Sequence, residues 1–80
     1  MTVIWGPSAM RDMRRLDSPL ARQVRDQVER FAIAGVGNVK RLRGEGGVCR
    51  LRSGDWRVRY VRRGDDLHVL AIKPRSEAYR

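Results

Sequence analysis

Alternation of apolar and charged side chains in "DWRVRYVRRG", residues 55–64, restricts the possible folds more than any other feature of the sequence. Successive side chains of a β-strand point to opposite faces of its sheet. Trp56, Val58 and Tyr60 would therefore share one face, while Arg57 and Arg59 would share the other. A strand that only built a core would not carry so much charge. The pattern predicts a sheet with one apolar face and one exposed face of guanidinium groups.

The segments on either side of this strand extend the same sheet. In "VCRLRSG", residues 48–54, Cys49 and Leu51 alternate with Arg50 and Arg52. Further strands are predicted at "VKRLRG", residues 39–44, and at "DLHVLAIK", residues 66–73. Glycine-rich turns separate these runs, and a tight Gly-Asp turn precedes the last one. The second half of the chain is therefore predicted to form an antiparallel meander.

The first half of the chain is predicted to cover the apolar face. "TVIW", residues 2–5, is a β-branched and aromatic run that reads as a strand. Apolar residues at helical spacing then predict a short helix with Ser8 as its cap. Ser18 is a plausible cap for a second helix, which has Pro19 in its first turn and runs to about Ala34. We expect these helices to form a hairpin.

These elements together predict one α+β domain over residues 1–80. Its order is an N-terminal strand, a two-helix hairpin and an antiparallel sheet meander. A chain of 80 residues is short enough for a single domain to be expected. Its core would be thin, since so small a domain buries only about 60% of the surface of its unfolded chain.

Basic residues dominate the charge. Eighteen Lys and Arg stand against nine Asp and Glu, for a formal net charge of +9, and Lys40 and Lys73 are the only lysines. Arginine binds phosphate through two parallel hydrogen bonds and keeps its proton in water. The balance indicates a polyanionic partner: nucleic acid, an acidic protein or, less often, a membrane surface. The alternative is a cationic surface that serves only solubility.

Several kinds of chemistry have no support in the sequence. Cys49 is the only cysteine and His68 the only histidine, and no cluster has the spacing of metal ligands. We expect Cys49 to be a small core residue, His68 to be a half-buried strand residue, and the chain to need no metal or cofactor. No apolar run approaches the ~20 residues of a membrane span, and the N-terminus lacks a signal-peptide pattern. The expected location is the cytoplasm, without membrane association.

The C-terminal segment "IKPRSEAYR" combines Lys73, Arg75 and Tyr79. A tyrosine beside basic residues could stack on a base or exchange a proton. The alternative is a frayed terminus in which Tyr79 is a packing residue. RNA can supply its own nucleophile, the ribose 2′-hydroxyl, so Arg and Lys would only have to stabilise charge at the phosphate. A basic sheet face and a basic tail could therefore cleave RNA without metal or histidine, although poorly unless another body positions the RNA.

The stretch from Arg41 to Arg80 resembles the C-terminal half of the RelE/ParE superfamily of type II toxin–antitoxin toxins. The resemblance is carried by a Leu-Arg-Gly segment, by the strand pattern Arg-x-Gly-Asp-Trp-Arg-Val-x-Tyr and by the tail ending in Arg-x-x-x-Tyr. The segment "SAMRDMRRLDSPLARQVRDQVERF", residues 8–31, is similar to the opening helices of the family. This resemblance implies a small βααβββ-type toxin that a cognate antitoxin holds inactive in a toxin–antitoxin hetero-oligomer. RelE-type members cut mRNA, commonly in the ribosomal A site.

The resemblance also implies roles for individual residues. Arg57 matches the strand arginine that contacts the scissile phosphate, and Tyr79 matches the catalytic tyrosine. Lys73 stands where the family usually has an arginine, and Arg75 follows two residues later, so either could act as acid or charge stabiliser. The basic residues expected to bind RNA are Arg50, Arg52, Lys40, Arg41 and Arg43.

Three functions remain open at this point. The first is a ribosome-dependent endoribonuclease, which the pairing of Arg57 with Tyr79 favours. The second is a non-nuclease toxin that inhibits DNA gyrase, as in the ParE branch. The third is an inactive member that only binds its antitoxin or nucleic acid. The role of Arg59 also stays open between the RNA surface and contact with the antitoxin.

Overall fold

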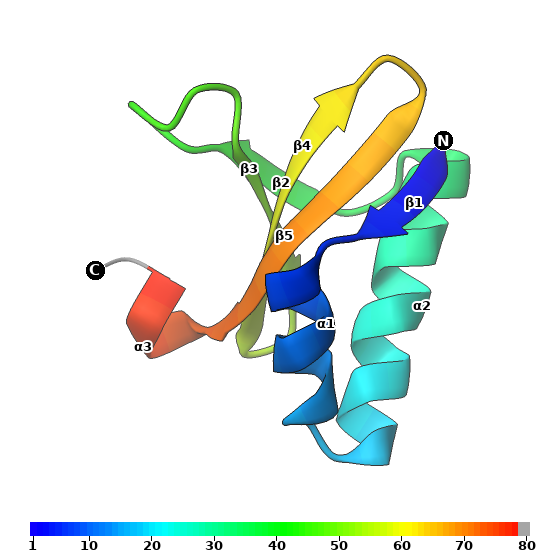
Figure 1. The fold of residues 1–80 in the computed structure, drawn as a ribbon, viewed down its shortest axis with the longest axis vertical. Coiled ribbons are helices and arrows are strands. Elements are labelled where there is room, and N and C mark those ends of the chain that lie inside the picture. Colours follow the sequence, from blue (N-terminus) through cyan, green and yellow to red (C-terminus); the bar gives the residue numbers. More distant parts are fainter. Residues whose placement is uncertain (79–80) are drawn as a thin grey trace.

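The computed structural model describes residues 1–78 as a helical layer against one sheet (Figure 1). Helices α1 and α2 lie side by side on one face of the sheet, and a short third helix follows the last strand. The elements are β1 (Thr2–Trp5), α1 (Pro7–Arg14), α2 (Ser18–Ala34), β2 (Asn38–Arg41), β3 (Cys49–Ser53), β4 (Trp56–Arg63), β5 (Asp66–Pro74) and α3 (Arg75–Ala78).

The sheet has five strands in the order β1-β5-β4-β3-β2. Strands β2 to β5 form the predicted antiparallel meander, which places β4 at the centre. Strand β1 pairs with β5 in parallel, so the sheet is mixed. The predicted α+β order of strand, helical hairpin and meander is confirmed. The sequence pattern did not reveal α3, which is only four residues long.

The helix starts differ from the prediction in their caps. Gly6 is the N-cap of α1 and forms no side-chain cap bond, so Ser8 does not cap this helix. The N-cap of α2 is Asp17, whose carboxylate accepts a hydrogen bond from the Leu20 N–H at 3.0 Å, so the predicted Ser18 cap is also wrong. Pro7 and Pro19 both lie in first turns, where a missing N–H costs nothing.

The core lies between the helices and the apolar sheet face. Leu51, Val58 and Ile72 form a row across β3, β4 and β5, and all three are fully buried. Burial of one such side chain contributes roughly 1.5–3 kcal/mol. Val24 and Val28 of α2 pack in the same cluster.

A β-bulge changes the alternation in β5. Tyr60 pairs with Val69 but Arg59 pairs with Ala71, so Leu70 is an additional residue on this strand. The bulge lets Leu67, Val69 and Ile72 all face the core, although a regular period of two would have turned Ile72 to the opposite face. Lys73 is thereby placed beside Arg57 on the open face.

Candidate functional site

The face of the sheet that the helices leave uncovered, here called the open face, carries two cross-strand rows of basic residues. The first row joins Arg52, Arg57 and Lys73 from β3, β4 and β5. The second joins Lys40, Arg50 and Arg59 from β2, β3 and β4. Residues directly opposite each other on neighbouring strands have Cβ atoms about 4.5–5.5 Å apart. The register therefore concentrates positive charge from separate parts of the sequence on one surface.

Arg57 lies on this face, but it is buried. Only 3% of the residue is exposed, so the prediction of an exposed guanidinium is wrong. Its Nη1 donates to the carbonyl oxygens of Gly54 at 2.9 Å and Trp56 at 3.1 Å. Strand β4 is central and α3 packs against this end of it, which explains the burial. The alternation therefore predicted correctly on which face Arg57 lies, but it did not predict that the side chain is buried.

Buried guanidinium nitrogens mark the same surface. The Nε atoms of Arg50 and Arg57 are both buried and have no hydrogen-bond partner among the described residues. Most buried polar groups in proteins are hydrogen-bonded, so donors left without a partner require an explanation, such as a ligand that completes them. A phosphate oxygen is one acceptor that suits a guanidinium.

Glu45 brings a carboxylate to this basic surface. It lies in the β2–β3 loop, between glycines at positions 44 and 46 that both have positive φ angles. Its Oε1 lies 3.1 Å from Nη1 of Arg59, and both side chains are partly exposed. In the sequence, this loop reads "GEGG", which predicts a glycine-rich turn and gives no sign of the ion pair.

The other predicted RNA-binding residues divide between surfaces. Lys40 of β2 pairs with Arg50 of β3, and its side chain lies on the open face. Arg52 is exposed on the same face, so Lys40 and Arg52 both belong to the basic surface. Arg41 pairs with Cys49, which puts it on the opposite face of the edge strand β2, away from that basic surface. Arg43 is exposed in the β2–β3 loop. The five predicted residues therefore do not share one surface of the fold.

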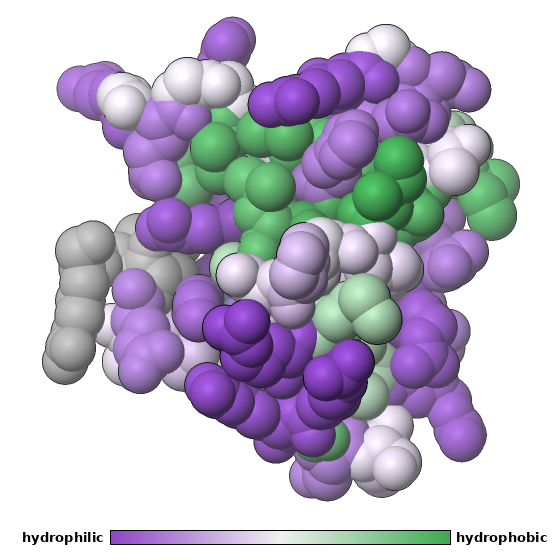
Figure 2. Space-filling view, in the orientation of Figure 1, coloured by the Kyte–Doolittle hydropathy of each residue, from purple (hydrophilic) through white to green (hydrophobic). Residues whose placement is uncertain are grey.

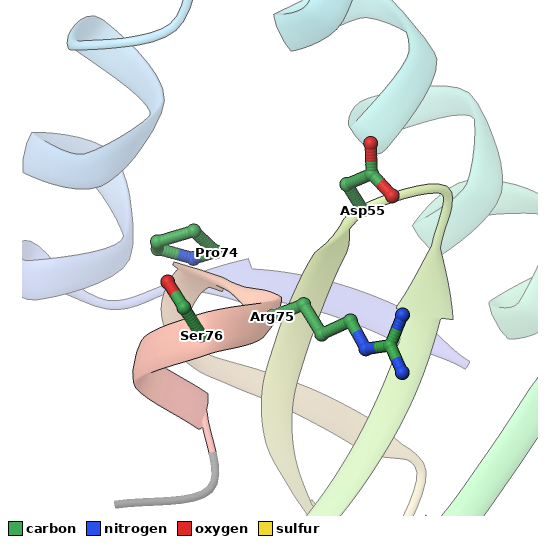
Figure 3. Close-up of a pocket in the computed structure, with 4 residues that line it drawn as sticks. All are labelled: Asp55, Pro74, Arg75 and Ser76. Atoms are coloured by element: carbon green, nitrogen blue, oxygen red, sulfur yellow. The ribbon is translucent and has the colours of Figure 1, made fainter.

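Helix α3 begins at Arg75, two residues after Lys73, the last member of the first basic row. The Arg75 N–H donates to the carbonyl oxygen of Asp55 at 2.8 Å, which ties the start of α3 to the β3–β4 turn. Asp55, Pro74, Arg75 and Ser76 line a pocket of about 610 Å³ beside this contact (Figure 3). Tyr79, predicted to be catalytic, lies outside the described residues.

Asp12 is a residue of this region that sequence reasoning missed. It is 8% exposed, and its Oδ2 accepts a hydrogen bond from the Ile72 N–H at 2.9 Å. Its Oδ1 lies 3.4 Å from Nζ of Lys73. The signal was an acid three residues after Ala9, on the apolar side of α1, where a buried charge needs a partner.

Tyr60 has a perturbed pKa, but its side chain belongs to the core. Burial, with a smaller contribution from the neighbouring Cys49, raises the pKa of Tyr60 to about 12. The ring packs against Phe31 of α2 with centroids 5.3 Å apart. This phenol faces the helices and not the basic surface, so its pKa concerns stability. His68 is half-buried in β5, as predicted.

Within residues 1–78, no group of three or more His, Cys, Asp or Glu side chains could hold a metal ion. None of the helices in that part of the chain is long and apolar enough to cross a membrane.

Comparisons with known proteins agree with the fold and the sequence pattern. Residues 3–79 match the family described as ParE toxin of type II toxin–antitoxin system, parDE. Among curated proteins, no sequence matches the chain.

Solved structures with this fold include several antitoxin–toxin complexes. The RelB–RelE complex from Methanococcus jannaschii matches with a TM-score of 0.77 and 14% identity, covering 95% of this chain and 94% of that one. The RelE–RelB complex from Pyrococcus horikoshii has a TM-score of 0.77 and 23% identity, with coverage of 95% and 96%. The RelBE2 complex from Mycobacterium tuberculosis has a TM-score of 0.75 and 26% identity, with coverage of 92% and 96%. The chain therefore belongs to the ParE toxin family, within the RelE/ParE superfamily of type II toxin–antitoxin toxins.

Proposed function

We propose that this toxin is an endoribonuclease that cleaves mRNA, in the ribosomal A site, and thereby inhibits translation. The observation that carries the proposal is the pair of basic rows on the open face. Arg50 and Arg52 of β3 lie beside Arg59 and Arg57 of β4, so four arginines that could bind phosphate are neighbours at the sheet centre. Such electrostatic contacts supply most of the sequence-independent affinity for nucleic acid.

The chemistry requires little from the protein beyond charge and alignment. The 2′-hydroxyl of the RNA attacks the adjacent phosphorus, so an O2′–P bond forms and the P–O5′ bond breaks. A base takes the 2′-hydroxyl proton, and an acid returns one to the departing 5′-oxygen. The products are a 2′,3′-cyclic phosphate and a 5′-hydroxyl end. Guanidinium groups near the phosphate stabilise the charge that develops on its oxygens.

Arg57 is proposed to bind the reacting phosphate through the guanidinium N–H groups that are not already bonded to the protein backbone. Its Nη1 holds the β3–β4 turn, whereas its buried Nε has no described partner. Tyr79 is proposed to be the proton-transferring group, as the family resemblance implies. Neither tyrosine nor arginine is an efficient acid or base near neutral pH, because both titrate far above it. A ribosome that positions the RNA would compensate for this weakness.

A cognate antitoxin is proposed as the protein partner, in a hetero-oligomer. The exposed apolar side chains of the sheet include Ile4 of β1 and Leu70 of the bulge. Figure 2 shows hydrophobic residues gathered in the upper half of the view, where Figure 1 places β1, β5 and β4. Exposed apolar area of this kind often marks a protein interaction site. The related solved complexes with antitoxins support the same partner class.

Inhibition of DNA gyrase is the second candidate function. The specific observation in its favour is that the matching family is described as ParE. The basic open face also suits a DNA-bound target, because phosphate contacts do not distinguish RNA from DNA. In both cases the chain would act in the cytoplasm.

Controlled expression separates the candidates. Translation, replication and mRNA integrity are followed after induction, and the 5′ ends of mRNA fragments are mapped. Cleavage within codons, with 5′-hydroxyl ends, is the expected result. Intact mRNA together with gyrase-linked DNA breaks would replace this proposal with the gyrase function. Intact mRNA without DNA breaks, in cells that contain the folded protein, would indicate an inactive member.

A further inference from the structure

Lys73 and Arg75 are the two basic residues that could act at the phosphate from the end of β5, and the fold uses them differently. Strand β1 pairs with β5 only as far as Val69, so the last part of β5 has an open edge on that side. Asp12 of α1 occupies this edge and accepts the Ile72 N–H at 2.9 Å. Its carboxylate takes the place of a missing strand partner.

The same carboxylate attracts the Lys73 ammonium. Nζ of Lys73 lies 3.4 Å from Oδ1 of Asp12, and the acid side chain is only 9% exposed. A buried carboxylate is costly unless a cation compensates it, so this pair has a structural purpose. Asp12, Lys73, Leu16 and Trp56 also line a cavity of about 160 Å³. That volume is well below the roughly 300–1,000 Å³ of typical ligand sites, so this cavity is too small to enclose a nucleotide.

Arg75 lies in different surroundings. Its backbone N–H is fixed by the hydrogen bond to the Asp55 carbonyl. Its side chain is exposed and forms no hydrogen bond or ion pair with another described residue. Figure 3 shows the side chain pointing from α3 towards β4 and β3, away from the Asp55 carboxylate. Arg75 lines an open hollow of about 610 Å³ on the surface, a volume within the range of typical ligand sites. All five guanidinium donors remain available to a phosphate.

We propose that Arg75 supplies the tail's positive charge to the reacting phosphate and that Asp12 and Lys73 are positioning residues. The pair fixes the end of β5, from which Arg75 projects two residues later. This assignment rests on the proposed nuclease function. It differs from the family pattern, which aligns its tail arginine with Lys73. A rigid anchor two residues before a catalytic group matters because small displacements at a reacting centre cost much of the rate.

Cleavage assays with purified ribosomes and mRNA test the assignment. Arg75→Gln removes an exposed charge and should lower the cleavage rate about a hundredfold, as loss of one charge-stabilising donor typically does. Lys73→Gln and Asp12→Asn should each lower it about tenfold through mispositioning, and the double variant should be no worse than either single variant. Arg63→Gln is the matched control: it is exposed at the far end of β4, and its rate should be unchanged.

A second measurement does not depend on activity. Chemical unfolding of the same variants gives the coupling between Asp12 and Lys73, expected to change the unfolding equilibrium about threefold or more. Arg75→Gln should unfold like the unchanged chain, so its lost activity would not reflect lost structure.

The outcomes distinguish this assignment from the function on which it rests. If Lys73→Gln abolishes cleavage while Asp12→Asn and Arg75→Gln stay active, Lys73 contacts the phosphate and the assignment is wrong. If the unchanged chain does not cut ribosome-bound mRNA, the nuclease function and the role of Arg75 in it both fail. The anchoring role of Asp12 and Lys73 would still be decided by the unfolding data, where absence of coupling would overturn it.

Discussion

The two faces of the central sheet use neighbouring residues of the same strands for opposite purposes. On the covered face, Leu51, Val58 and Ile72 form one row, and every member is fully buried. The adjacent row on the open face is not uniform. Arg52 is exposed and Lys73 is half-buried, but Arg57 between them is 3% exposed.

The difference teaches that alternation assigns a side chain to a face but does not determine its burial. The covered face is uniform because two helices lie over it. The open face varies because α3 covers only one end of it and because the β3–β4 turn engages Arg57. Changes on the covered face should therefore affect stability, changes at exposed open-face residues should affect activity, and a change at Arg57 should affect both.

The largest effect on stability is expected from Leu51→Ala on the covered face. Leu51 is fully buried at the centre of the core row, so the truncation loses buried area and leaves a cavity. The free energy of unfolding should fall by about 2–5 kcal/mol, as measured by chemical denaturation. Arg52→Ala, one residue along the same strand, should change it by less than about 0.5 kcal/mol. Equal losses for both variants would mean that the two faces do not differ as described.

The second effect concerns the pH dependence of the covered face. The pKa of Tyr60 is raised from 10.0 to about 12, chiefly by burial. Below pH 10 the phenol is neutral in both states, and its contribution to stability is fully present. Between pH 10 and 12 the phenol of the unfolded chain ionises first, so stability falls as pH rises. Each pKa unit is worth about 1.4 kcal/mol, which gives a loss of about 3 kcal/mol.

Tyr60→Phe separates this loss from other alkaline effects. The variant has no phenol to ionise, so its unfolding free energy should lack the part of the decline between pH 10 and 12 that Tyr60 causes. Parallel declines in the two proteins would show that Tyr60 titrates alike in the folded and unfolded states.

Sequence reasoning reached the architecture because the pattern and the packing agree. Alternation in residues 55–64 and helical spacing in residues 18–34 both reflect one covered face, and the structure has that face. The site was harder to predict, since its geometry depends on contacts between distant segments. The Asp12–Lys73 pair joins residues 61 apart, and the bulge at Leu70 has no local signature in "DLHVLAIK".

The third effect concerns Arg57, which lies on the open face but is as buried as the residues of the covered face. Arg57→Ala removes the donor that holds the carbonyls of Gly54 and Trp56, so unfolding should become easier by about 1–3 kcal/mol. Cleavage should also fall, but Arg57→Lys should recover part of the stability and little of the activity, because lysine lacks the planar fork. Unfolding and ribosomal cleavage are measured on the same samples. An Arg57→Ala protein of unchanged stability would support the freely exposed guanidinium that the alternation predicted.

The smallest effect is expected at the rim of the open face. Glu45 pairs with Arg59 at 3.1 Å, and both side chains are partly exposed. Such pairs contribute at most about 1 kcal/mol, so Glu45→Gln should change stability very little. On the proposed nuclease function, this carboxylate would compete with phosphate for Arg59, so its removal should tighten binding of a short RNA by up to about fivefold.

Salt dependence distinguishes competition at Arg59 from a general change in charge. Glu29→Gln on the exposed surface of α2 makes the same change in net charge and serves as the control. RNA affinity is measured from low to high salt for both variants. Because Glu45→Gln removes a carboxylate that would compete with phosphate at Arg59, its log affinity should fall more steeply with log salt than that of the control. Identical slopes and affinities would mean that Arg59 does not contact RNA, which would leave the antitoxin as the partner for this end of the basic rows.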